Sequence, residues 1–158
     1  MKKLKGLLVG LSLAAVSVAM SATVAWANNV SQTKKSGVYS VTLKVLPAEA
    51  FMGPKAAMQW VGGAKPMDLS AKPKPNHHMV VFLQEKGKPV AKAMVSISYR
   101  QLTPKPGRWM SVHVARMSVK GKGPSTTHFG NNLVLATGKY VARVQVNRLH
   151  PVYFHFTL

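Results

Sequence analysis

Short segments in which apolar and polar residues alternate restrict the fold of this chain more than any other feature. In residues 38–46, the apolar side chains Val41, Leu43 and Val45 fall on one side of an extended chain, with polar residues on the other. Residues 140–146 alternate in the same way. A period of two residues is typical of a β-strand with one buried face. The chain is therefore predicted to be built from half-buried strands.

Further strands are predicted between clusters of Gly and Pro, which punctuate the chain every 8–12 residues or so. They cover residues 56–61, 77–84, 90–99, 109–119, 132–135 and 152–158. The stretch 77–84 is apolar on both faces and is expected to be central. No ten-residue stretch after the first 27 residues has good helical periodicity. The sequence predicts an all-β, immunoglobulin-like antiparallel sandwich of about seven or eight strands.

The N-terminus has the pattern of an export signal. Lys2, Lys3 and Lys5 precede an apolar run over residues 7–20, and Ala25-Trp26-Ala27 fits a small-x-small cleavage site. This pattern predicts a signal peptide at 1–27, with an uncleaved anchor as the alternative. A flexible lead at 28–37 and one sandwich domain at 38–158 would follow. The mature protein is expected to be soluble and periplasmic or secreted.

Composition excludes several kinds of chemistry. The chain has no Cys, which excludes thiol catalysis, thiolate zinc sites and blue-copper centres. It has only three acidic residues, Glu49, Asp68 and Glu85, and neither Asp68 nor Glu85 belongs to a recognisable catalytic triad. No phosphate-binding Gly-rich loop occurs. We therefore expect no enzymatic activity.

Charge points to the kind of partner. The chain has 22 Lys and Arg against three acids, and removal of the three signal lysines would leave a net charge of +16. Such a surface attracts anionic partners. Because export separates the protein from cellular nucleic acid, an acidic periplasmic or membrane protein is the expected partner. The scarcity of carboxylates also suggests tolerance of an acidic compartment, because carboxylate protonation is the usual route to acid unfolding.

Histidine and methionine are the remaining candidates for chemistry. On an extended chain, His77 and Met79 share one face, and so do His113 and Met117. Imidazole and thioether together suit copper, and thioether is a poor ligand for hard cations. Ordinary packing is the alternative for each residue taken alone. The candidate metal ligands are His77, His78, Met79, His113, Met117 and His128.

Two blocks of sequence resemble a known group of proteins. Residues 76–93 resemble the HHMMVFL…GKPV block of small exported immunoglobulin-like metal-handling proteins, and residues 116–144 resemble their M…H-[YF]-G…GKY block. The group includes periplasmic iron/copper uptake accessory proteins and, more distantly, FixH/YtkA-like and CopC-like domains. The resemblance implies a copper-type site formed by His77 or His78, Met117 and His128.

Two departures from the group bear on this assignment. The spacing between Met117 and His128 is longer here, so Met110 or His113 could replace Met117. Acidic residues that would hold a second cation in the group are nearly absent, which favours copper over iron. The expected function is thus a periplasmic copper carrier or accessory protein, with its site at one end of the sandwich. The alternative is a basic interaction module without metal, which binds an acidic protein or anionic envelope material.

Overall fold

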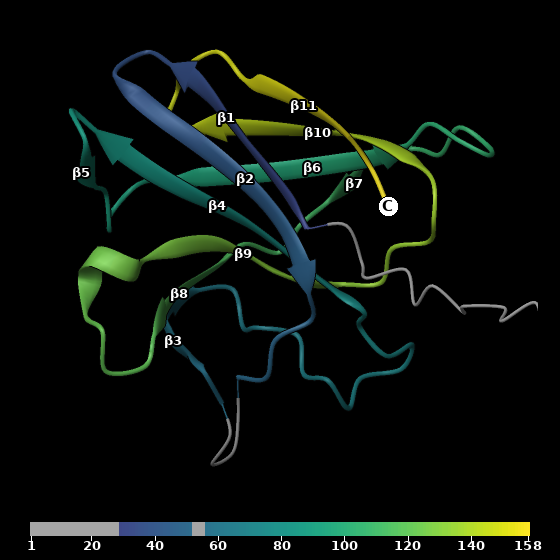
Figure 1. Cartoon of the computed structure of the whole chain (residues 1–158), viewed down its shortest axis with the longest axis horizontal. Helices are drawn as coiled ribbons and strands as arrows, with labels where there is room; N and C mark the ends of the chain where they lie inside the picture. The colour runs from purple at the N-terminus through teal and green to yellow at the C-terminus, as the bar shows by residue number, and fades with distance from the viewer. Residues whose placement is uncertain (1–28, 52–55) are drawn as a thin grey trace, which may run out of the picture.

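Two antiparallel sheets form the protein (Figure 1). The computed structural model describes residues 29–51 and 56–158. The expected signal peptide lies outside the described residues. The seven-stranded sheet has the order β1-β2-β4-β9-β8-β3, with β5 on β4, and the four-stranded sheet has the order β11-β10-β6-β7. Their bounds are β1 Val30–Ser36, β2 Tyr39–Pro47, β3 Met58–Gly63, β4 His77–Glu85, β5 Lys88–Pro89, β6 Val95–Gln101, β7 Met110–Ser111, β8 Ala115–Val119, β9 His128–Leu133, β10 Lys139–Val146 and β11 Val152–Thr157.

The core lies between the sheets and follows the predicted alternation. Val41, Leu43 and Val45 of β2 are fully or almost fully buried against inward residues of the second sheet, such as Val144 and Phe154. Burial of this apolar surface is the main favourable contribution to folding. The antiparallel β-sandwich predicted from the sequence is confirmed. Among the described residues, no helix is long and apolar enough to span a membrane.

Two strands have other bounds than expected, since β6 begins at Val95 and not at residue 90, and β9 begins at His128 and not at residue 132. Two further expectations, about the existence and the continuity of strands, are wrong. Residues 28–37 were expected to be a flexible lead, but β1 pairs with β2 along its whole length, from Val30 opposite Val45 to Ser36 opposite Tyr39. β1 is an edge strand with mainly polar side chains, a composition that resembles a loop in sequence.

The second wrong expectation is one continuous strand over residues 109–119. The chain instead contributes β7 to the smaller sheet, crosses over residues 112–114, and continues as β8 in the larger sheet. Val112 is buried at this crossing and its amide donates to the carbonyl of Ile97. An apolar core residue therefore occupies the crossing where a sequence breaker would be expected.

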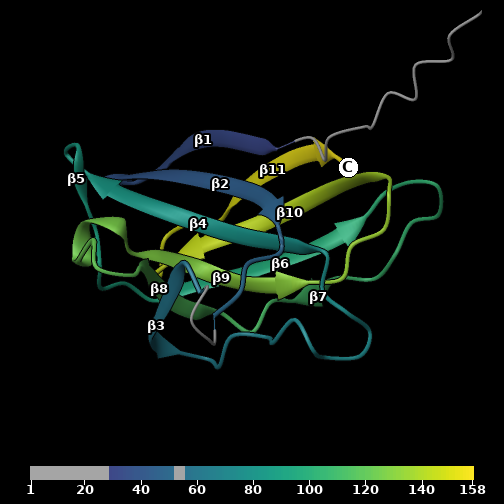
Figure 2. The ribbon, with the colours of Figure 1, turned by 60° about the horizontal axis from the view of Figure 1, so that its bottom comes forward.

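A second, smaller apolar cluster lies outside the sandwich core. It comprises Val80, Ala115 and Met117, with Phe51 and Phe82 packed against it. Val80 alternates with the core residues Met79 and Val81 along β4, so it faces away from the four-stranded sheet. In Figure 2 the segment between β3 and β4 runs along the bottom of the view, beside β8 and β9. The outer face of the larger sheet is thus partly covered by its own connections.

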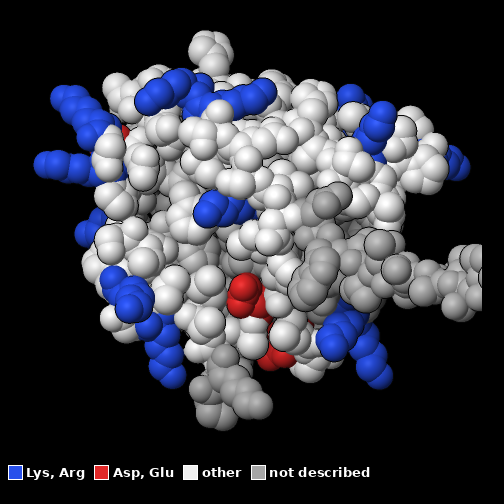
Figure 3. All heavy atoms as spheres, viewed as in Figure 1, with Lys and Arg blue, Asp and Glu red and all other residues white. Residues whose placement is uncertain are grey.

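Charge is unevenly distributed along the fold. No Asp or Glu occurs after Glu85 at the end of β4. On the face shown in Figure 3, blue Lys and Arg side chains are spread mainly around the rim and only small red areas are visible. Every strand of the four-stranded sheet therefore comes from the part of the chain that has no acids.

Candidate functional site

Strand register brings two histidines together on the outer face of the larger sheet. His78 lies on β4 and His128 on β9, and between them Val80 is directly opposite Gly130. The two histidines are offset by four residues along neighbouring strands, about 14 Å at 3.4 Å per residue. Their ring centres are nevertheless only 5.8 Å apart, with the planes at 87°. Both side chains therefore lean toward the Val80–Gly130 pair.

Small residues make room for the two rings. Ala115 of β8 is directly opposite Gly130, so neither residue fills the centre of this face. Gly130 is also required by its backbone, because an added Cβ would overlap the carbonyl group of Met79 on β4. The close approach of β4 and β9 and the space for the imidazoles thus depend on the same glycine.

Met117 borders the same space. It is directly opposite His128 in the β8–β9 register and its side chain is fully buried. Directly opposed residues of antiparallel strands share a face, with Cβ atoms about 5 Å apart. The face therefore collects two imidazoles and one thioether from three adjacent strands.

Aromatic rings enclose the histidines. The ring of Phe51 lies 5.4 Å from that of His78, and the ring of Phe82 lies 5.1 Å from that of His128, measured between ring centres. Both histidines have no exposed surface. The imidazoles are thus separated from bulk solvent by apolar contacts.

Hydrogen bonds determine which ring nitrogen of His78 carries the proton. Its Nδ1 lies 2.9 Å from Oδ1 of Asn132. That amide is oriented by the surrounding backbone, because its Nδ2 donates to the carbonyls of Glu49 and Met67 and its Oδ1 accepts the Glu49 amide. The Asn132 oxygen can therefore only accept, and His78 Nδ1 carries the proton.

The same reasoning applies to His128. Its Nδ1 lies 2.9 Å from the carbonyl oxygen of Thr126, which can only accept a hydrogen bond. In a neutral imidazole the other nitrogen then has a free lone pair. The Nε2 atoms of both His78 and His128 are buried and have no hydrogen-bond partner. Two bare nitrogen lone pairs therefore lie in an enclosed apolar space.

Burial keeps both imidazoles neutral. It lowers the pKa of His78 to about 4, with a further contribution from the repulsion of a charged His128, while the bond to Asn132 acts weakly in the opposite direction. Burial also lowers the pKa of His128, and the bond to the Thr126 carbonyl opposes this. Removal of a charged imidazole from water is costly, so the neutral form is favoured.

The structure separates the six candidate ligands. His78, Met117 and His128 share the outer face described above, whereas Met79 packs in the core between the sheets. His77 is partly exposed, and its Nδ1 lies 2.8 Å from Oδ1 of the neighbouring Asn76. His113 is exposed in the crossing between β7 and β8. The expected pairs His77–Met79 and His113–Met117 are thus not the groups that the fold brings together.

The location also differs from expectation, because the histidines lie on a sheet face and not at an end of the sandwich. Sequence reasoning missed Asn132, which orients His78, and Phe51 and Phe82, which enclose the rings. Two adjacent asparagines, Asn131 and Asn132, in the fully buried strand β9 were the available signal. Within the described residues, no three side chains of the His, Asp or Glu type cluster. A metal at this face would therefore depend on the thioether of Met117.

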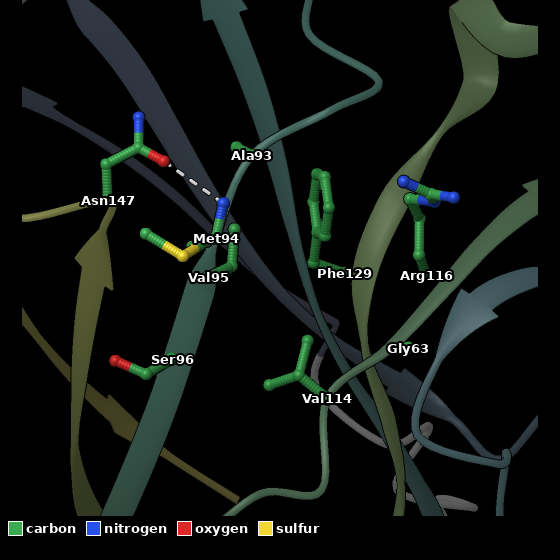
Figure 4. Close-up of a pocket in the computed structure, with 9 residues that line it drawn as sticks. All are labelled: Gly63, Ala93, Met94, Val95, Ser96, Val114, Arg116, Phe129 and Asn147. Atoms are coloured by element: carbon green, nitrogen blue, oxygen red, sulfur yellow. Dashed lines mark hydrogen bonds between the residues drawn. The ribbon is translucent and has the colours of Figure 1, made fainter.

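A separate hollow of about 450 Å³ opens on the other side of β9 (Figure 4). It is lined mainly by apolar or small residues, including Val95, Val114 and Phe129. Its one charged lining residue, Arg116, donates from Nη2 to the carbonyl of Val61. The hollow contains no histidine, and its lining offers no metal-binding set.

Together, the fold and the site define an antiparallel β-sandwich protein with a buried histidine pair on one outer face. Its structure is similar to the crystal structure of a DUF4426 family protein from Pseudomonas aeruginosa PAO1, with a TM-score of 0.52 and 20% sequence identity. The similarity covers 81% of this chain and 94% of the other. At this identity the likeness shows the fold alone. No family model and no curated protein sequence matches the chain.

Proposed function

We propose that the protein binds one copper ion, as Cu(I), between His78 and His128, with the thioether of Met117 as third ligand. The observation that carries the proposal is the pair of buried Nε2 atoms without partners. Buried polar groups in proteins are nearly always satisfied, so two adjacent exceptions call for an occupant. A cation that accepts both lone pairs satisfies them together.

Ring separation supports a shared ion. With metal–nitrogen bonds of about 2 Å, two imidazoles on one ion place their ring centres about 6 Å apart. The observed separation is 5.8 Å. The hydrogen bonds from Nδ1 to Asn132 and Thr126 are of the kind that orient metal-binding histidines in many proteins.

Ligand chemistry selects the metal. Thioether is soft and favours Cu(I), and zinc would need a fourth ligand, which the described residues around the pair do not supply as His, Asp or Glu. The resemblance of residues 76–93 and 116–144 to exported metal-handling proteins of the iron/copper uptake accessory type is compatible with this choice. We propose a carrier or accessory role in the periplasm, in which the ion is stored or passed to an acidic or membrane partner.

Titration with Cu(I) under anaerobic conditions, in competition with a chromophoric chelator, tests the proposal. We expect one ion per chain for the mature protein. The variant His78→Leu/His128→Leu should lose at least about a hundredfold in affinity, equivalent to about 3 kcal/mol. Leucine fills a similar volume without a lone pair, so the variant is expected to fold. The matched control, His77→Ala/His113→Ala, also removes two histidines and should bind as the parent does.

Two results would contradict the proposal. Equal losses in the two double variants would place the metal elsewhere. Absence of stoichiometric binding by the folded parent would leave a water molecule, which can donate to both nitrogens, as the occupant of the site. The same titration at pH 5 is a further test. Because burial lowers the pKa of both histidines, protons should compete only weakly with copper for the nitrogens, and binding should persist at this pH.

A further inference from the structure

The outer face of the four-stranded sheet carries an ordered cluster of arginine and aromatic side chains. The guanidinium carbons of Arg100 and Arg143 lie 5.2 Å and 5.3 Å from the centre of the Trp109 ring. Arg143 also donates from Nε to Oγ of Ser98 at 3.2 Å. Cations at this distance from an indole are attracted by its π-system. One indole therefore holds two like charges.

Register shows that the cluster covers the sheet face. Arg143 is directly opposite Ser98, and Val141 is directly opposite Arg100. Val141 points outward with Arg143, since the intervening Ala142 belongs to the core, yet only 4% of Val141 is exposed. The side chains above it are thus packed down onto the strands, and the arginines are preorganised.

Neither arginine has a carboxylate on this sheet. The three acids of the chain precede β5, and none lies in β6, β7, β10 or β11. Two guanidinium groups that contact the same indole, with no Asp or Glu on their own sheet, repel each other. An anionic ligand would relieve this repulsion.

From this cluster we infer that the outer face of the four-stranded sheet docks an acidic protein, whose carboxylates pair with Arg100 and Arg143 around Trp109. Guanidinium groups bind carboxylates through paired hydrogen bonds. Trp, Tyr and Arg are the residue types that dominate binding energy at protein interfaces, and Tyr153, 44% exposed, is directly opposite Arg143. The inference does not depend on copper binding.

The character of the face favours a protein over a lipid surface. The Trp109 ring is in contact with two guanidinium groups, while membrane-binding surfaces insert aromatic and aliphatic groups between lipid chains. Strands β6, β10 and β11 have 7, 8 and 6 residues and β7 has two. At about 3.4 Å per residue and about 4.8 Å between strands, the face measures roughly 380 Å². That size suits a transient contact.

Binding of a labelled oligo-glutamate peptide tests the inference. Trp60→Phe leaves Trp109 as the single tryptophan of the mature chain, so its fluorescence reports on the face directly. We expect the peptide to change this fluorescence, and Arg100→Gln/Arg143→Gln to weaken binding about tenfold or more. Trp109→Leu, which retains both charges, should also weaken it several-fold by releasing the arginines.

A matched control separates a built surface from general attraction to a basic protein. Lys86→Gln/Lys88→Gln removes the same charge from exposed positions in the β4–β5 hairpin and should change affinity less than about twofold. Equal losses in the two double variants would overturn the inference, and so would absence of peptide binding at low salt. Arginine-dependent binding to phosphatidylglycerol vesicles without peptide binding would also overturn it, in favour of a membrane surface.

Discussion

Acidification should destabilise the metal-free protein, because His78 must remain neutral while it is buried. Its pKa falls from 6.5 to about 4 on burial. Between these values the unfolded chain binds a proton at this residue and the folded chain does not. The free energy of unfolding therefore decreases as the pH falls from about 6.5 to about 4.

The structure gives the size of the effect. A shift of about 2.5 pKa units corresponds to about 3 kcal/mol at roughly 1.4 kcal/mol per unit. This is a large part of the stability of a typical domain, about 5–15 kcal/mol. His128 acts in the same direction, since burial lowers its pKa too. Asp68 does not interfere in this window, because a hydrogen bond from the Ser70 backbone lowers its pKa below 3.8.

Urea unfolding of chelator-treated protein at pH 7, 6 and 5 measures the effect. From pH 6.5 to 5 the parent should lose about 2 kcal/mol through His78 alone. His78→Leu should remove that share of the pH dependence. It should leave stability at pH 7 nearly unchanged, because Asn132 Oδ1 keeps the Glu49 amide as a donor at 3.1 Å.

The control is His113→Ala, at an exposed position, which should retain the slope of the parent. A parent whose unfolding free energy is the same at pH 7 and pH 5 would refute the reasoning. An unchanged slope in His78→Leu would show that the acid sensitivity arises elsewhere.

Two substitutions test the packing around the site. Gly130→Ala should destabilise the protein by about 3 kcal/mol or more, measured by chemical unfolding, because the new methyl group overlaps the carbonyl of Met79 and must separate β4 from β9. A loss under 1 kcal/mol would contradict that close approach. Asn132→Ala should cost about 2 kcal/mol or more, since two loop carbonyls and His78 lose a partner. Hydrogen exchange should then rise at the Glu49 amide, which donates to Asn132 Oδ1. Unaltered exchange at this amide would show that Asn132 does not hold the segment around Glu49 in place.

Alternation in the sequence was sufficient to predict the sandwich, because an inward residue at every second position is what a two-sheet core requires. The prediction from alternation failed where pairing with other strands, and not the local sequence, determines the structure. The polar segment 30–36 becomes a strand because β2 offers it a partner along seven residues. The run 109–119 breaks because its two halves pair with different sheets, and no local breaker marks the crossing at Val112.

The candidate site was predictable only in part. His78, Met117 and His128 were among the residues chosen, since imidazole and thioether are the metal-binding side chains that remain in a sequence with no Cys and three acids. Alternation alone could not show which side of β4 faces the core, the side with His77 and Met79 or the side with His78. Both faces of this strand are apolar, and only the fold shows that one meets the second sheet while the other meets Phe51.

The two faces of the larger sheet explain how a site with two unsatisfied buried nitrogens coexists with a stable core. Met79 and Val81 of β4 face the second sheet, and their packing does not involve the imidazoles. His78 and Val80 face outward beneath a cover that Asn132 ties down through the Glu49 and Met67 carbonyls. The unsatisfied nitrogens thus lie in a small cluster on the outer face. A ligand could enter or leave this cluster without repacking of the sandwich core. Because that cover is held by hydrogen bonds to loops, access to the histidines is expected to depend on local opening of these loops and not on global unfolding.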